Sequence, residues 1–150
     1  MLLLARYVLP VCGPHFEYGG VVVHDGEIVA IGTRDELLGA YPQEEVHDYG
    51  QAALMPGFID LHTHLEYGSF RGVVNDLPYS QWKMQVMSLE SRLTEEDWKN
   101  SAELGVIESI RSGITTFADI TVSGTSVEPA ARSGLRGVIY REASTMDKSQ

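Results

Sequence analysis

The segment Met55–Leu65 constrains the fold of this chain more than any other, because it places two histidines on what reads as a buried strand. Side chains alternate between the two faces of a strand, so His62 and His64 point the same way while Leu61 and Thr63 point the other way. Two residues on one strand face lie about 6.6 Å apart at their Cα atoms, a distance from which two imidazole rings can converge on one divalent metal ion. The segment therefore predicts half of a metal site.

Taken alone, a pair of histidines at this spacing is more often a surface or core feature than a metal site. Here the pair closes the run Pro56-Gly57-Phe58-Ile59-Asp60-Leu61-His62-Thr63-His64, and over this string the chain resembles the metal-dependent amidohydrolase superfamily. In that family the first barrel strand ends in such a His-x-His. The resemblance therefore implies that His62 and His64 bind a divalent metal, zinc in the first place and iron as the alternative.

The length of the chain bounds how much of that fold it can contain. It has 150 residues, whereas a complete (β/α)8 TIM barrel takes about 250 and seldom fewer than about 200. We therefore expect an α/β fold that forms the N-terminal part of such a barrel, preceded by strands of a small β-sandwich domain. Residues 1–53 are expected to supply the strands of this small composite domain, and residues 54–150 the first three strand–helix units of the barrel.

The first third of the chain reads as short antiparallel strands over residues 2–9, 20–24 and 27–32. Asp25-Gly26 lies between the last two of these and is typical of a type I′ hairpin turn, which needs positive φ at both positions. Thr33 is followed three residues later by Glu36, the pattern of a capping box. A single helical turn is expected there.

From residue 54 onward the pattern changes to alternating strands and helices. A long loop is expected over residues 66–80, then a helix from the N-cap Thr94 to about residue 112, with Trp98 and Ile110 buried and Gly113 as the stop. Strands are expected at 54–64, 114–119 and 135–141, with a shorter helix at 127–133. Strand, helix, strand, helix, strand is the order of a parallel α/β fold.

The composition excludes several classes of partner. The chain carries 11 Lys and Arg against 21 Asp and Glu, a net charge of −10, which opposes nucleic acid because that binding needs clustered cations. No apolar stretch approaches the roughly 18 residues of a membrane span, and one cysteine, Cys12, cannot form an internal disulfide. We expect a cytoplasmic protein with a small-molecule substrate. An open sheet also exposes one flank of its third strand, which favours homo-oligomers.

Further motifs resemble the branch of the family that deaminates amino-purines, adenosine-like nucleosides and triazines, together with its chlorohydrolases. They are Arg71-Gly72, Asp76-Leu77-Pro78, Trp82 and the run Leu89-Glu90-Ser91-Arg92-Leu93-Thr94. By this resemblance Glu90 matches a glutamate that hydrogen-bonds substrate hydroxyls, and Arg141 matches an arginine at the substrate pocket. Trp82 is assigned to the same pocket.

Three acids near the expected site have open roles. Asp60 shares a face with the two histidines and either orients an imidazole or binds backbone amides. Asp119 ends the second barrel strand, and a structural role is favoured. Glu66 follows His64 and is expected near the metal, where it could contact substrate.

The resemblance implies a metal-dependent hydrolase that replaces an exocyclic amine on a nitrogen heterocycle or a nucleoside-like substrate. Its remaining ligands and its proton-shuttling glutamate are expected beyond residue 150, because no histidine follows His64. Residues 1–150 alone are therefore expected to be inactive. Two alternatives stay open: a two-metal hydrolase of cyclic amides, and a truncated, inactive chain that serves only as a folding or interaction module.

Overall fold

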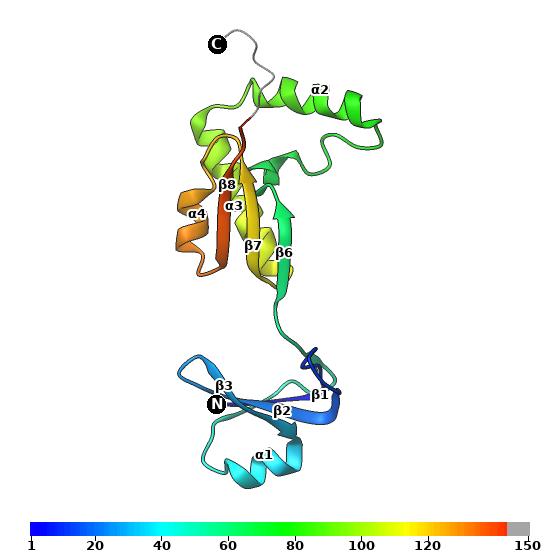
Figure 1. The fold of residues 1–150 in the computed structure, drawn as a ribbon, viewed down its shortest axis with the longest axis vertical. Coiled ribbons are helices and arrows are strands. Elements are labelled where there is room, and N and C mark those ends of the chain that lie inside the picture. The colour runs from blue at the N-terminus through cyan, green and yellow to red at the C-terminus, as the bar shows by residue number, and fades with distance from the viewer. Residues whose placement is uncertain (144–150) are drawn as a thin grey trace. The chain divides into compact units, whose positions relative to one another are not determined.

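The computed structural model describes residues 1–143, which form two compact units (Figure 1). The first unit runs from Met1 to Pro56, and the second begins at Gly57. None of the helices within residues 1–143 is both long enough and apolar enough to cross a membrane.

A five-stranded sheet and one short helix make up the N-terminal unit. The strands lie in the order β3-β2-β1-β4, and β5 also pairs with β1. The first three are antiparallel, whereas β4 and β5 run parallel to β1. The elements are β1 (Leu2–Val8), β2 (Phe16–His24), β3 (Glu27–Thr33), α1 (Arg34–Ala40), β4 (Val46–Asp48) and β5 (Ala53–Leu54).

Helix α1 covers one face of this sheet. Leu37 of the helix packs against Leu2, Leu4 and Val22 of the sheet, and all four side chains are buried. The hairpin turn is as expected, because Asp25 and Gly26 have φ values of 50° and 82°. The capping box is also present, since the Glu36 carboxylate accepts from the backbone amide and the hydroxyl of Thr33.

Strand β2 starts four residues earlier than expected, at Phe16 in place of residue 20. Gly19 and Gly20 lie inside this strand. A Cβ atom on Gly20 would stand 2.7 Å from Cδ2 of Leu4 and 2.9 Å from the carbonyl oxygen of Leu3. Gly20 is therefore required by close packing against β1.

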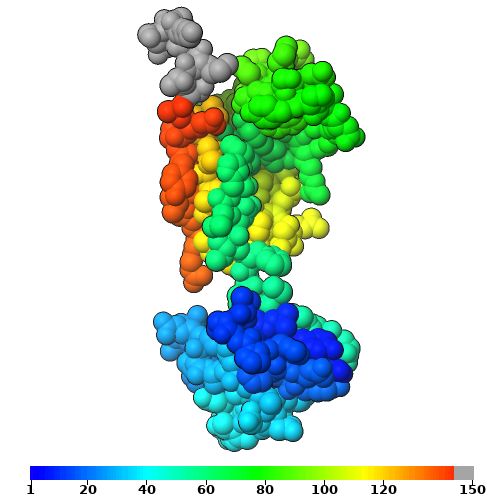
Figure 2. Space-filling view, turned by 45° about the vertical axis from the view of Figure 1, so that its right-hand side comes forward, coloured from blue at the N-terminus to red at the C-terminus, as the bar shows by residue number. Residues whose placement is uncertain are grey.

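The second unit has three parallel strands in the order β6-β7-β8. Its elements are β6 (Phe58–Thr63), the 3-10 helix η1 (Leu65–Phe70), α2 (Tyr79–Glu90), α3 (Glu95–Arg111), β7 (Ile114–Thr121), α4 (Val127–Arg132) and β8 (Arg136–Arg141). Leu65, Val106, Phe117 and Ala130 form its buried core, which joins η1, α3, β7 and α4. In Figure 2, β6 (blue-green) is uncovered at the surface of this unit, and four of its six residues are exposed.

Helix α3 begins and ends where the sequence predicts. Its N-cap Thr94 and Asp97 form a reciprocal capping box, and Gly113 beyond its end has a φ of 79°. Ile110, however, is 48% exposed, so the expectation that it is buried is wrong. The face of α3 that packs inward is instead the one with Ala102 and Val106.

The expected loop at residues 66–80 contains the helix η1 and the first two residues of α2. Apolar periodicity does not reveal η1, because η1 packs on α3 through its backbone. A Cβ atom on Gly105 would lie 2.2 Å from the carbonyl oxygen of Leu65, and one on Gly68 would lie 2.5 Å from that of Ser101. Two glycines therefore allow η1 and α3 to approach closely.

Candidate metal and substrate site

The two histidines lie where β6 ends, at the edge of the sheet at which the strands have their C-termini (Figure 1). The imidazole rings of His62 and His64 have centroids 5.3 Å apart and planes inclined by 75°. His62 is exposed and His64 is partly buried. The alternation of the strand thus brings both rings to one side, as the sequence predicts.

One ring nitrogen of His64 is fixed by β7. Nδ1 lies 2.8 Å from the carbonyl oxygen of Ile120. A carbonyl only accepts hydrogen bonds, so Nδ1 donates, and in the neutral ring Nε2 then carries the lone pair. A metal-binding histidine is commonly held in this way, with its second nitrogen bonded to a carbonyl or a carboxylate.

These features fit a divalent metal, but they supply only two of its ligands. Imidazole nitrogen is a ligand for zinc and for iron. Nowhere in residues 1–143 do three or more His, Cys, Asp or Glu side chains come together in a way that could hold an ion. The described part of the chain can therefore contribute the pair His62 and His64 to a larger ligand set.

The carboxylate of Asp60 binds a backbone amide of its own strand. Its Oδ1 accepts a hydrogen bond of 3.1 Å from the amide of His62, beside a shift in the register between β6 and β7. Of the two roles open to Asp60, the structure shows the bond to a backbone amide.

The Glu66 carboxylate binds the end of β7. Its side chain is fully buried and accepts hydrogen bonds from the hydroxyl of Thr121 at 2.5 Å and from the amides of Val122 and Ser123 at 2.5 and 3.2 Å. The hydroxyl of Ser123 donates to it as well. The expectation that Glu66 could contact substrate is wrong, because both of its oxygens already hold the end of β7.

Asp119 of β7 in turn binds the segment that follows β6. It is also fully buried, and its two oxygens accept from the amide of Leu65 at 2.8 Å and from the hydroxyl of Ser126 at 2.6 Å. Residues 64, 65 and 66 are thus each bonded to the chain around the end of β7. We call these contacts the β6–β7 clamp, formed by His64 with Ile120, Leu65 with Asp119, and Glu66 with residues 121–123.

Tyr67 is the site residue that the sequence analysis missed. Its ring stacks on His64 with centroids 5.1 Å apart and planes within 17°, and its hydroxyl donates to Oε1 of Glu90 at 2.5 Å. Burial and the neighbouring Glu90 carboxylate raise the pKa of this phenol well above its ordinary value. In a 3-10 helix, residues three apart lie above one another, so His64, Tyr67 and Phe70 stack. That three-residue spacing was the available signal.

The three residues assigned to the substrate pocket have different surroundings. Glu90 ends α2 and reaches the neighbour of His64 through Tyr67. Trp82 stacks on Tyr79 of its own helix at 6.0 Å. Arg141 ends β8, is exposed, and extends toward Gly124. Among residues 1–143 no hydrogen bond joins Trp82 or Arg141 to the histidine pair, whereas Glu90 is linked to it by one side chain.

A hollow of about 310 Å³ borders the site on the side of α3. It is lined by Thr63, His64, Tyr67, Arg71 and Glu108, among others. The Arg71 guanidinium donates to the Glu108 carboxylate at 2.6 Å across this hollow. Arg71 therefore ties the segment after η1 to α3.

Known proteins resemble this chain over most of its length. A family model described as the amidohydrolase family matches residues 53–143, and one described as the imidazolonepropionase-like composite domain of bacteria matches residues 19–43. The 5-methylthioadenosine/S-adenosylhomocysteine deaminase of Syntrophobacter fumaroxidans is 38% identical over 130 residues, which cover 85% of this chain and 30% of that protein. The corresponding deaminase of Thermodesulfovibrio yellowstonii is 38% identical over 128 residues, or 82% and 29%. The chain thus spans about 30% of the length of these curated relatives.

Solved structures with the same fold are more distant in sequence. Helicobacter pylori aminofutalosine deaminase in complex with methylthio-coformycin superposes with a TM-score of 0.81 at 24% identity, over 95% of this chain and 35% of that one. Atrazine chlorohydrolase TrzN from Arthrobacter aurescens, complexed with zinc, gives 0.79 at 22% identity, over 98% and 37%. These likenesses confirm the expected α/β class with strands of a TIM barrel. The chain belongs to the amidohydrolase family.

Proposed function

We propose that the full-length protein is a metal-dependent hydrolase that removes an exocyclic amine from the heterocycle of a nucleoside-like substrate. One observation carries this proposal: His64, with Nδ1 bonded to the carbonyl of Ile120, presents Nε2 beside His62 at the C-terminal end of a barrel strand. Active sites of (β/α)8 enzymes lie at this end. The relatives named 5-methylthioadenosine/S-adenosylhomocysteine deaminase support the reaction class.

In this proposal His62 and His64 hold a divalent metal ion, with zinc as the first choice and iron as the second. Bound there, the ion supplies Lewis-acid activation of water. The chain's own contribution is orientation: the β6–β7 clamp fixes the ring of His64 before any ligand arrives. Glu90 accepts a hydrogen bond from a substrate hydroxyl, and Arg141 and Trp82 line the pocket.

The proposal extends to the organisation of the protein. The sequence predicts a boundary between residues 53 and 54, whereas the first unit ends at Pro56 because β5 pairs with β1. In this proposal that unit supplies the strands of the small composite domain, and the chain from Gly57 onward supplies the first three strand–helix units of the barrel, which are incomplete. Residues 144–150 lie outside the described part of the chain. We further propose a cytoplasmic protein that acts on a small molecule, binds neither nucleic acid nor a membrane, and forms homo-oligomers.

The test removes each histidine from the full-length protein. His62→Ala and His64→Ala are expected to lower bound zinc at least tenfold and to abolish ammonia release from 5′-methylthioadenosine, because a two-residue ligand pair has no substitute nearby. His47→Ala is the matched control, since His47 is an exposed histidine of β4. Metal content by elemental analysis and ammonia by a coupled assay give the two readouts.

Three outcomes would contradict the proposal. Full metal occupancy in the His62→Ala, His64→Ala double variant would remove the ligand assignment. An equal loss of bound zinc and of ammonia release in His47→Ala would mean that these losses are not specific to the histidine pair. Two bound metal ions, together with hydrolysis of cyclic amides and no ammonia release, would favour the two-metal amidase instead.

A further inference from the structure

We propose that Tyr67 is a positioning residue that fixes the Glu90 carboxylate for a substrate hydroxyl and thereby sets the preference for substrates that carry one. This inference rests on the proposed function, because it takes Glu90 as the group that meets the substrate. It adds a residue that neither the sequence motifs nor the histidine pair identifies.

The first support is the bond itself. The hydroxyl of Tyr67 donates to Oε1 of Glu90 at 2.5 Å and joins η1 to the last residue of α2 across 23 residues of sequence. Within residues 1–143 no hydrogen bond reaches the other carboxylate oxygen, Oε2. One oxygen of Glu90 is therefore held by the protein and the other is left to accept from a ligand.

The second support is the rigidity of the tyrosine ring. It lies between His64 at 5.1 Å and Phe70 at 5.2 Å, with interplanar angles of 17° and 20°. The ring of Trp98 stands against both Tyr67 and Phe70 at 6.0 Å. A phenol confined on two faces cannot swing away, so the position of its hydroxyl is fixed relative to His64.

The third support is how little else holds this end of α2. Of the twelve residues of the helix, Val86 alone is buried. A glutamate at such a helix end otherwise populates several rotamers, and a ligand that needs one of them must bear the ordering cost. The bond from Tyr67 selects one rotamer in advance.

Tyr67 affects substrate preference because it contacts both His64 and Glu90. One face of its ring lies against His64, and its hydroxyl holds Glu90. A substrate whose reacting carbon lies at the histidine pair thus meets a carboxylate acceptor at a set distance. Because a carboxylate offers only acceptors, the matching group is a donor such as a ribose hydroxyl. A ligand without that donor leaves the oxygen unpaired and is disfavoured.

The experiment changes one atom of the protein and one pair of hydroxyls of the substrate. Tyr67→Phe keeps the ring stack and removes the hydroxyl. In the full-length, metal-loaded protein we expect it to raise KM for adenosine about tenfold, the size of one hydrogen bond to a charged group, with kcat within about twofold. KM for 2′,3′-dideoxyadenosine and the zinc content are expected to stay unchanged. Tyr49→Phe, at an exposed tyrosine of the N-terminal unit, is the control.

A second variant tests whether the two residues act together. Glu90→Gln is expected to lose the preference for adenosine over its dideoxy analogue. In that background Tyr67→Phe should add nothing, since its effect passes through Glu90. Additive losses in the double variant would overturn the proposal.

Several other results would overturn the positioning role of Tyr67 or the proposed function. An unchanged or lowered KM for adenosine in Tyr67→Phe, an equal rise for both nucleosides, or a loss of zinc would each overturn the positioning role. If the unmodified protein releases no ammonia from any amino-heterocycle, the proposed function fails separately. Calorimetric binding of the same two nucleosides then replaces turnover, and Tyr67→Phe must still weaken adenosine binding alone. If neither nucleoside binds, the role of Tyr67 is overturned with it.

Discussion

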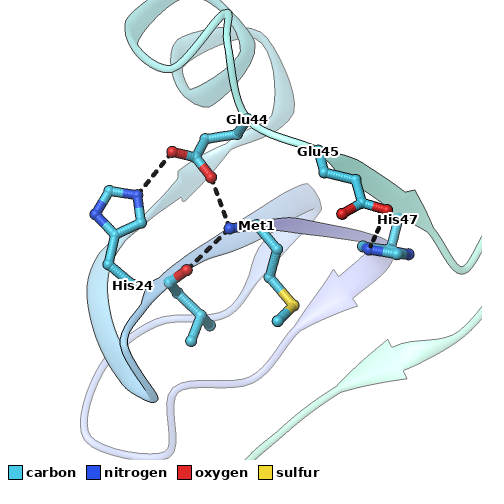
Figure 3. Close-up of polar contacts among 6 residues, drawn as sticks. Met1, His24, Glu44, Glu45 and His47 are labelled. Carbon is cyan, nitrogen blue, oxygen red and sulfur yellow. Dashed lines mark hydrogen bonds and ion pairs between the residues drawn. The ribbon is translucent and has the colours of Figure 1, made fainter.

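Histidines lie beside carboxylates in both units of the molecule, but the two units hold them in different ways. In the N-terminal unit Nε2 of His24 lies 2.8 Å from Oε1 of Glu44, whose Oε2 accepts from the Met1 ammonium at 2.6 Å (Figure 3). Nearby, His47 pairs with Glu45 at 3.4 Å. These side chains meet water, and exposed pairs of this kind contribute little stability.

In the second unit the two buried carboxylates near His64 bind backbone and hydroxyl groups. Glu66 and Asp119 are fully buried, and each accepts at least two such bonds. The Nδ1 atom of His64 is bonded to the carbonyl oxygen of Ile120, and within residues 1–143 no hydrogen bond reaches its Nε2. The difference shows that proximity of histidine and acid does not identify a metal site in this chain. The proposed metal site differs from these exposed pairs by the bond that orients the imidazole of His64.

The largest expected effect concerns the catalytic capacity of the segment itself. Residues 1–150 alone, supplied with zinc and a panel of amino-purines and amino-pyrimidines, are expected to release no ammonia. The histidine pair falls short of the three protein ligands that a catalytic zinc site uses, and the described residues offer no third. Metal-dependent ammonia release would show that two histidines suffice or that copies of the chain complete each other's sites.

The next effect contrasts the buried and exposed carboxylates directly. Glu66→Ala is expected to lower the free energy of unfolding by about 3 kcal/mol, because it leaves buried donors of residues 121–123 without an acceptor. Glu66→Gln should lower the free energy of unfolding less, since the carbonyl oxygen of its side chain can still accept a hydrogen bond. Glu44→Ala serves as the exposed counterpart and should lose far less than either. Urea unfolding of the three variants measures this, and similar losses for Glu66→Ala and Glu44→Ala would remove the distinction between the units.

The smallest effect is a pH dependence in the N-terminal unit. The Met1 ammonium and His24 lower the pKa of Glu44 below its ordinary 4.5. A group with a lowered folded pKa stabilises the fold above its unfolded pKa, and this is lost as the pH falls through the folded value. Glu44→Gln should therefore reduce the loss of stability on acidification from about pH 7 to about pH 3. His24→Ala should reduce it less, because the ammonium remains. Identical profiles for Glu44→Gln and the unmodified chain would argue against these bonds.

Much of the fold was predictable because its signals are local. Asp25-Gly26 specifies its turn by the backbone angles that it tolerates, and Thr94 with Asp97 specifies the start of α3 within one helical turn. The alternation of β6 places His62 and His64 on one side without any knowledge of the rest of the molecule.

The parts that were missed depend on contacts between distant residues. Glu66 and Thr121 are 55 residues apart, and nothing near either residue indicates the hydrogen bond that joins them. Helix η1 depends on the close approach of its backbone to that of α3. Glycines permit this approach, but their presence in the sequence does not predict it. Tyr67 became visible as a site residue only when the three-residue turn of η1 put its ring on His64.

The hydrogen bond from His64 to Ile120 also bears on the order in which the protein is made. The two residues are 56 positions apart, so His64 leaves the ribosome long before the carbonyl that orients it exists. Pairing of parallel strands over such a separation is slow, because the chain between them must first be closed into a loop. During synthesis the imidazole of His64 is therefore unrestrained until β7 has docked. Under the proposed function, a metal ion therefore meets an oriented His64 imidazole only after β7 has docked.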